Sequence, residues 1–368
     1  MYVFDRAPLR AIGLSPLLLQ RAQACFALAF PGGALDAAVS LLRITEVHRE
    51  SLRLHDGRAD RIARAHPRLL RELADQDTAL AVGDWVLSVP DAHGTVWIHA
   101  RVPPLNHLVR RDADGRRHAV VSNVDTALLV MGLDDDFNLR RLERYLALVQ
   151  GSGVPAVVVL TKADVAALRP DLLAKAMTAL RLRLPGWLDV VMVDGTSPAA
   201  ADTIAPWLSP GGTVVLLGSS GAGKSTLTNT LAGWVLQGTG AVRSHDSRGK
   251  HTTTSRSLFL LPGGACVIDT PGLRALRPDL DQARLGASFG DIQRLAPQCR
   301  FRNCQHGSEP GCAVREGVDA DRLRNYEKLL RESRRDTLNV FERRQQLAQW
   351  KARGRESEAR ARQKRGEW

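Results

Sequence analysis

The sequence contains the glycine-rich run Gly218-Ser219-Ser220-Gly221-Ala222-Gly223-Lys224-Ser225, which matches the pattern G-x-x-x-x-G-K-[ST]. An apolar strand pattern at 214–217 precedes it, and a helical pattern at 226–231 follows. Glycines let consecutive backbone N–H groups surround phosphate oxygens, and the following helix adds the positive end of its dipole. We therefore expect a nucleoside triphosphate here, with Lys224 on the outer phosphates and Ser225 as a ligand of Mg²⁺.

The residues on either side of this loop alternate between strand and helix patterns. Apolar strands are expected at 127–130, 156–160, 189–193 and 213–217, and helices at 139–149 and 163–182, the second broken at Pro170. Strands that are apolar on both faces and separated by helices are typical of a parallel sheet covered on both sides. Residues 113–285 are therefore predicted to form an α/β nucleotide-binding domain.

Three further loops follow strands of this predicted domain. Asp269-Thr270-Pro271-Gly272 offers a carboxylate on the Mg²⁺ side and the Gly272 N–H for the terminal phosphate. In Thr161-Lys162-Ala163-Asp164, the Asp164 carboxylate can accept two hydrogen bonds that guanine donates and adenine does not. Asp194-Gly195-Thr196-Ser197 is a candidate for contact with the guanine carbonyl. Together these loops predict a GTP site.

The order of these loops is unusual. In ordinary GTPases the base-reading loop comes last, whereas here residues 161–164 precede the phosphate-binding loop. The sheet can keep its geometry if the original termini are joined and the chain is reopened elsewhere, because termini often lie close together. The order therefore predicts a circularly permuted GTPase.

The polar segment 244–254 has the composition of a switch. One of its threonines is expected at Mg²⁺ and the γ-phosphate, with Thr252 and Thr253 preferred and the choice left open. Leu273 stands where many GTPases carry a water-orienting glutamine, so intrinsic hydrolysis should be slow. His251 is the candidate that positions or activates water; the alternative is a solvent-facing loop histidine.

A cysteine-rich segment predicts a metal site. Cys299, Cys304, His306 and Cys312 supply three sulfurs and one imidazole, the ligand set of a structural tetrahedral Zn²⁺ site. The chain has 5 cysteines, and an odd count with three grouped together argues against a disulfide framework. The alternative is a reduced cluster without metal.

The flanking regions are predicted from weaker patterns. Residues 41–112 are expected to form an OB-fold-like β-barrel, with strands near 82–87 and 95–98 and room for a helical insertion within 51–75. Residues 1–40 form an extension to which no role is assigned. Residues 286–368 are expected to form a helical zinc-binding domain with a basic C-terminal tail.

Charge restricts the partner. The chain has 51 Lys and Arg against 39 Asp and Glu, a net charge of +12, which favours a polyanion such as RNA, DNA or an anionic membrane surface, or else a generally basic enzyme. No run is apolar and long enough to span a bilayer, and the N-terminus is a poor secretory signal. We therefore expect a cytoplasmic protein without a membrane partner, and a monomer.

These motifs together resemble the ribosome-small-subunit-dependent GTPase A family. The resemblance rests on residues 161–164, 218–226, Gly249-Lys250-His251-Thr252-Thr253-Thr254, residues 269–272 and the Cys299–Cys312 segment. It implies an N-terminal OB-fold, a permuted GTPase domain and a zinc-bearing helical domain. It also implies late maturation of the small ribosomal subunit, contact with its rRNA, and hydrolysis of GTP to GDP that the subunit stimulates.

The resemblance also assigns roles to residues. His251 and Lys224 would be catalytic, and Cys299, Cys304, His306 and Cys312 would bind zinc. The predicted nucleotide-binding residues are Thr161, Lys162, Ala163, Asp164, Gly218, Ser219, Ser220, Gly221, Ala222, Gly223, Lys224, Ser225, Thr226, Thr252, Thr253, Asp269 and Gly272. Thr161 replaces the commoner asparagine, which we expect to weaken one contact that tethers the base-reading loop. Two other functions stay open: a P-loop kinase, and an RNA-binding module with GTP as a structural ligand.

Overall fold

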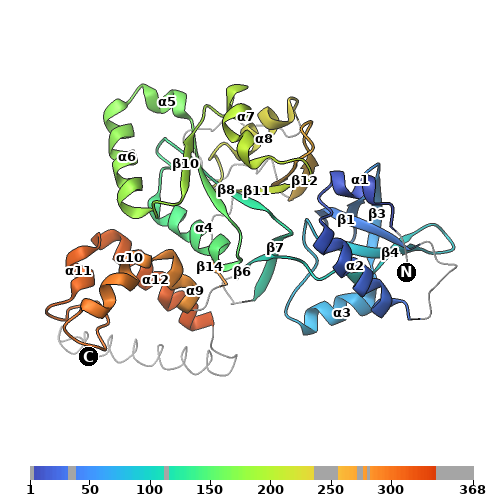
Figure 1. Ribbon diagram of the computed structural model, residues 1–368, viewed down its shortest axis with the longest axis horizontal. Helices are drawn as coiled ribbons and strands as arrows, with labels where there is room; N and C mark the ends of the chain where they lie inside the picture. Colours follow the sequence, from blue (N-terminus) through green and yellow to red (C-terminus); the bar gives the residue numbers. More distant parts are fainter. Residues whose placement is uncertain are drawn as a thin grey trace, which may run out of the picture. The chain divides into compact units, whose positions relative to one another are not determined.

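The computed structural model describes residues 4–31, 39–111, 116–235, 256–271, 277–279 and 282–336. These residues fall into two units, Met1–Pro278 and Asp279–Trp368, and each is considered by itself. Figure 1 traces the chain through both. The predicted switch segment and the basic tail lie outside the described residues.

A mostly parallel sheet carries the predicted nucleotide loops. Its strand order is β10 (Asp189–Met192), β9 (Ala156–Thr161), β8 (Thr126–Gly132), β11 (Thr213–Leu217), β13 (Cys266–Asp269) and β12 (Ser257–Leu260). All pairs are parallel except β12–β13. Every residue of β9 and β11 is buried, which explains why all but one residue of each strand is apolar. The α/β architecture predicted for this region is confirmed.

Helices cover both faces of this sheet (Figure 1). They are α4 (Leu139–Gly151), α5 (Ala163–Ala167), α6 (Pro170–Arg183), α7 (Ala199–Ile204) with the short η1 (Ala205–Trp207), and α8 (Lys224–Ala232). Leu142 and Leu146 of α4 are buried in one core, and Leu227 and Leu231 of α8 are buried in another. The expected break at Pro170 is confirmed, because proline fits the first turn of a helix and not its interior.

Five strands of the N-terminal region close into a barrel. The order is β1 (Ser40–Val47), β2 (Leu52–His55), β3 (Asp60–Ala65), β5 (Val96–Arg101) and β4 (Trp85–Pro90), and β4 pairs back with β1. Leu42, Ile44, Leu54, Val86 and Ile98 fill the interior. The helical insertion is confined to α3 (Pro67–Asp75), and β4 begins later than expected because residues 81–84 form a turn with Gly83 at φ 94°.

The N-terminal extension packs on this barrel. Helices α1 (Arg6–Ala11) and α2 (Pro16–Ala29) precede β1, and the Ser15 side chain caps α2. Leu18 and Phe26 of α2 share a buried core with Trp85 and Leu87 of β4. These helices cover an apolar outer face of the barrel that would otherwise meet water.

A small sheet and a helical unit complete the description. The sheet has the order β14 (Arg277–Pro278), β6 (His107–Arg111) and β7 (Arg117–Ser122). The second unit contains α9 (Gln282–Ser288), α10 (Gly290–Leu295), η2 (Ala296–Gln298), α11 (Ala313–Gly317) and α12 (Ala320–Asp336). No helix in the described ranges has the length and apolar character needed to cross a membrane.

Candidate nucleotide and metal sites

The glycine-rich run forms a turn between β11 and α8. Gly221 and Gly223 have φ of 82° and 90°, and a Cβ on Gly218 would lie 2.3 Å from the carbonyl oxygen of Val130. These positions therefore require glycine. The backbone N–H groups at the start of α8 have no helical partner, and they are the donors that a phosphate needs.

Lys224 folds back over this turn. Its Nζ donates to the carbonyl oxygens of Gly218 at 3.1 Å and Ser219 at 2.7 Å, and the residue is buried. Burial lowers the pKa of Lys224, while the negative charges of Asp269 and Asp136 oppose this shift. The Lys224 amine is thus held where the outer phosphates of a nucleotide would lie.

The carboxylate at the end of β13 meets the same turn. The Ser225 hydroxyl donates to Oδ2 of Asp269 at 3.1 Å, and Asp269 is buried. Thr270 anchors this strand end because its hydroxyl donates to the carbonyl oxygen of Leu216 at 2.7 Å. The Ser225 hydroxyl and the Asp269 carboxylate, oxygen ligands of the kind that Mg²⁺ prefers, therefore lie side by side, although they are 44 residues apart in the sequence.

The base-reading loop contacts the phosphate-binding turn directly. The buried Thr161 hydroxyl donates to the carbonyl oxygen of Ala222 at 2.6 Å. Thr161 also lies against Gly223, where an added Cβ would come within 3.2 Å of its Oγ1. The Thr161 hydroxyl therefore makes a contact that tethers the base-reading loop, and its weakness relative to an asparagine contact stays a prediction.

The other residues predicted to contact the guanine base lie at the start of α5 and in the loop 194–197, which precedes α7. Lys162 has φ of 60°, a left-handed conformation that ends β9, and Asp164 lies in the first turn of α5. Asp194 accepts hydrogen bonds from the N–H and hydroxyl of Thr196, and Thr230 of α8 donates to the carbonyl oxygen of Gly195 at 2.7 Å. The loop at 194–197 is thereby joined to the helix that follows the phosphate-binding turn.

Sequence reasoning missed two carboxylates that follow β8. Asp134 forms an ion pair with Lys162, and Asp136 accepts a hydrogen bond from the Ser219 hydroxyl. Arg141 of α4 holds Asp136 at 2.6 Å. Their position supplied a signal, because ligands of open α/β sheets bind outside the carboxyl ends of the strands and β8 lies next to β11.

Four predicted residues of the GTP site, His251, Thr252, Thr253 and Gly272, lie outside the described residues. Leu273, noted for the glutamine it replaces, lies there as well. Their roles therefore stay predictions.

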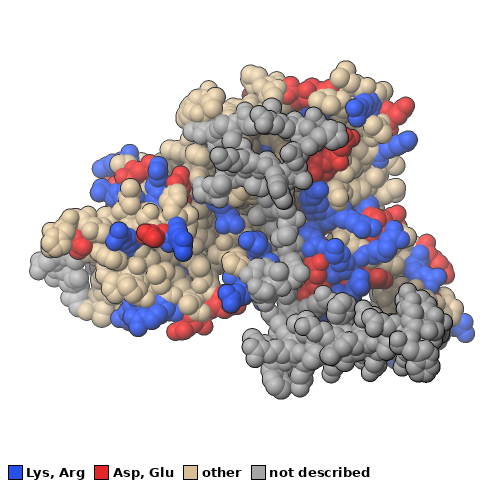
Figure 2. Space-filling model, turned by 180° about the vertical axis from the view of Figure 1, so that it is seen from behind, with Lys and Arg blue, Asp and Glu red and all other residues tan. Residues whose placement is uncertain are grey.

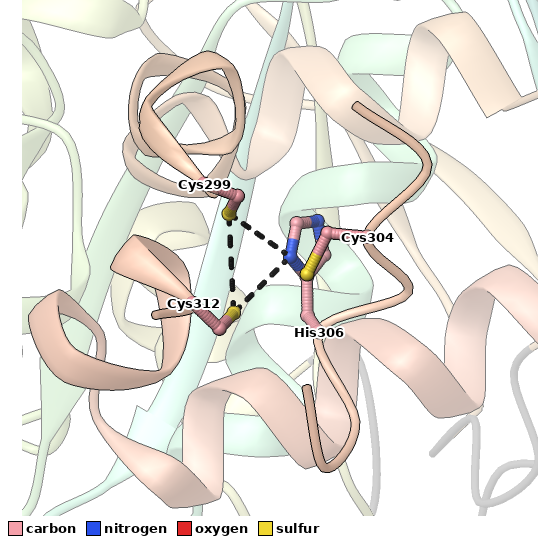
Figure 3. A group of neighbouring side chains, drawn as sticks. All are labelled: Cys299, Cys304, His306 and Cys312. Atoms are coloured by element: carbon pink, nitrogen blue, oxygen red, sulfur yellow. Dashed lines mark hydrogen bonds between the residues drawn. The ribbon is translucent and has the colours of Figure 1, made fainter. Parts of the chain in front are cut away.

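The four candidate metal ligands converge in the second unit (Figure 3). Cys299 follows η2, Cys304 and His306 lie in the connecting loop, and Cys312 caps α11. Their ligand atoms all lie within 4.8 Å of one another, so the cluster can hold a metal ion. The backbone N–H of Val314 lowers the pKa of the Cys299 thiol, whereas desolvation raises the pKa of the Cys304 thiol to about 11.

The distances test whether zinc fits. Tetrahedral bonds of about 2.3 Å to sulfur and about 2.0 Å to nitrogen place sulfurs about 3.8 Å apart and sulfur about 3.5 Å from nitrogen. Cys299 Sγ lies 3.9 Å from Cys312 Sγ, and His306 Nδ1 lies 3.7 Å and 3.5 Å from these two atoms. These three ligand atoms have the spacing of a tetrahedral site, and Cys304 Sγ lies within 4.8 Å of each of them.

Comparisons with known proteins agree with this geometry. A sequence model of the RsgA GTPase family matches residues 102–278. A protein of Xanthomonas oryzae pv. oryzae (strain MAFF 311018), named small ribosomal subunit biogenesis GTPase RsgA, is 44% identical over 295 residues, 78% of this chain and 79% of that protein. Its namesake from Xanthomonas campestris pv. campestris (strain B100) is 44% identical over 297 residues, with the same coverage.

Two solved structures share the fold. YjeQ from Thermotoga maritima covers 80% of this chain and 98% of its own, with a TM-score of 0.56 and 22% identity. YloQ, described as a circularly permuted GTPase, covers 82% and 97%, with a TM-score of 0.53 and 22% identity. The permuted order inferred from the loops is thus a property of this fold.

Proposed function

We propose that this chain, which belongs to the RsgA GTPase family and is therefore a GTP hydrolase, acts in assembly of the small ribosomal subunit. We also propose that the small subunit stimulates hydrolysis of GTP by this protein. The observation that carries the guanine nucleotide site is the 2.6 Å hydrogen bond from Thr161 to the carbonyl oxygen of Ala222. It joins the base-reading loop to the phosphate-binding turn, although the two come in reversed order along the chain.

The roles within this site follow from the contacts. Lys224 exchanges its two carbonyl partners for the β- and γ-phosphates, and Asp164 accepts hydrogen bonds from the guanine edge. Ser225 and Asp269 hold the Mg²⁺ that accompanies GTP. His251, outside the described residues, positions or activates the attacking water in place of the glutamine that Leu273 replaces.

We assign zinc to the cluster of Cys299, Cys304, His306 and Cys312, where it would join the loop 299–312 to α11. Three thiolates and one imidazole leave no position open for substrate, so the role is structural. The boundaries proposed for the chain are an extension at 1–40, the barrel at 41–112, the GTPase domain at 113–285 and a zinc-bearing helical domain at 286–368 with a basic tail.

The partner is proposed to be the small subunit and its rRNA. The net charge of +12 suits a polyanion, and Figure 2 shows Lys and Arg side chains gathered in groups on one face, with Asp and Glu between them. We further propose that the protein works as a monomer in the cytoplasm. GTP would order the switch on the particle, and hydrolysis would release it.

GTP turnover with and without purified small subunits tests this proposal. Wild type should accelerate strongly with subunits, His251→Ala should bind GTP but lose the acceleration, and Lys224→Ala should lose both. Turnover that subunits leave unchanged would contradict the proposal. A pulldown on subunits with a GTP analogue and with GDP tests the switch, and equal binding would exclude it.

A further inference from the structure

Two strands on the side of the barrel carry outward-facing aromatic residues. Strands β3 and β5 pair in parallel, with Arg64 opposite Trp97. Ala63 and Ile98 are buried in the barrel interior, so their neighbours on each strand face outward. Trp97 and Arg64 therefore lie outside the barrel core.

Four aromatic rings meet on this face. His66 stacks on His99 with ring centroids 5.1 Å apart and planes 22° apart. Trp97 meets His66 edge-on at 6.3 Å, and Phe30, which follows α2, contacts His99 at 6.1 Å. The N-terminal extension thus contributes a ring to the cluster. His66, Trp97 and His99 line a surface pocket whose other lining residues are Pro67, Val89, Pro90 and Asp91.

Hydrogen bonds hold two of these rings in place. Trp97 Nε1 donates to Oδ2 of Asp91 at 3.0 Å, and the other oxygen of Asp91 accepts from the backbone of His93 and Thr95. His66 Nδ1 accepts from the backbone N–H of Arg68 at 3.3 Å as it caps α3. Because the rings are anchored through their edges, a ligand can stack on them with little further loss of conformational freedom.

Positive charge lies beside the rings. Trp97 also lines a second pocket, with Arg49, Arg64 and Glu50. Both arginines are exposed, and among the described residues neither guanidinium forms an ion pair or hydrogen bond. Glu50 and Asp91 are the acidic groups of the two pockets, and Asp91 is already bound to Trp97. Free guanidinium groups next to aromatic faces match the phosphate and base of one nucleotide.

We propose that this face, formed by His66, Trp97, His99 and Phe30 with Arg64 and Arg49, binds an unpaired RNA nucleotide. The base stacks against the aromatic cluster and its phosphate lies on the guanidinium groups. The choice of RNA rests on the proposed function, since that function supplies an RNA particle as the partner. The site depends on unpaired bases, because a duplex keeps its bases stacked on one another.

The test measures binding of the full chain to fluorescently labelled oligouridine, with a duplex RNA of equal length for comparison. Trp97→Leu should weaken oligouridine binding about tenfold, and Trp97→Phe, which keeps a ring, should restore most of it. Arg64→Gln should reduce the dependence of affinity on salt by the contribution of about one phosphate. GTP binding by each variant shows that the chain is folded.

Matched controls come from the GTPase domain. Trp187 is 63% exposed and Arg181 is also exposed, so Trp187→Leu and Arg181→Gln make the same chemical changes elsewhere and should bind as wild type. Equal binding by Trp97→Leu and wild type, or no preference of wild type for the single strand, would overturn the site while leaving the proposed function intact. Turnover that subunits do not stimulate, together with a defect in Trp97→Leu, would keep the site and reject the proposed function.

Discussion

Replacing Thr161 by valine removes one hydroxyl and keeps the shape of the side chain. That hydroxyl donates to the carbonyl oxygen of Ala222 at 2.6 Å, and both residues are buried. Losing a buried partner costs about 1–3 kcal/mol, since water cannot replace it. The bond joins the loop that reads the base to the turn that binds phosphate, so its loss should loosen the site before nucleotide binds.

The expected effect on nucleotide affinity depends on how the lost free energy divides between nucleotide binding and the stability of the nucleotide-free protein. If about 1–1.4 kcal/mol must be recovered when nucleotide orders the two loops, GTP and GDP should both bind about 5–10-fold more weakly. The remainder should lower the melting temperature of the nucleotide-free protein by about 2–4 °C per kcal/mol. Nucleotide titration and thermal unfolding of the same preparations measure both effects.

Two further variants make this test specific. Thr161→Ser keeps the hydroxyl and should bind GTP nearly as wild type. Thr178→Val removes an exposed hydroxyl that donates to the carbonyl oxygen of Ala174 at 2.9 Å within α6, and it should change neither quantity by much. The reasoning is refuted if Thr161→Val binds GTP as tightly as wild type, or if Thr161→Ser is impaired as severely.

Three other perturbations have defined outcomes. Asp164→Asn should reduce the preference for GTP over ATP at least tenfold in a nucleotide competition assay. The asparagine NH₂ group is a donor, so it cannot accept a hydrogen bond from the guanine N–H groups as the carboxylate does. Cys312→Ser should lower zinc content from one ion per chain in metal analysis, with a fall in melting temperature. Burial raises the pKa of Asp84 to about 6, so this carboxyl group adds stability, on the order of 1 kcal/mol per pH unit, as pH falls from 6 to 4. Burial lowers the pKa of His107 to about 4, so this imidazole removes stability at a similar rate as pH falls from 6.5 to 4. Urea unfolding should therefore show Asp84→Asn losing stability on acidification relative to wild type, and His107→Gln gaining it.

Short-range signals made much of the GTPase domain predictable. Strands β9 and β11 are buried on both faces, so they are apolar at every position or nearly so and can be read without knowing their neighbours. Pro170 separates α5 from α6 because its ring excludes it from a helix interior. The spacing of the cysteines and the histidine likewise predicted a metal cluster, because all four candidate ligands lie within one short segment of the sequence.

The barrel was harder to predict than the sheet. Strands β2 and β3 bury only alternate or fewer positions, and their exposed residues include Arg53, Arg61 and Arg64. Such short half-exposed segments carry weak signals, since their conformation depends on the strands they pair with. The position of the N-terminal extension could not be predicted either, because the apolar face of α2 packs against a face of β4 that only the tertiary structure reveals.

The sequence by itself determined which local structures form and which chemical groups the loops carry, because strand burial, proline placement and glycine conformation act within a few residues. Only the tertiary structure decided which of those groups meet. The contact of Thr161 with Ala222, that of Asp136 with Ser219 and the rings around Trp97 each join segments remote in sequence. Such contacts depend on the order of strands in the sheet and on the packing of helices, and no local sequence pattern specifies either.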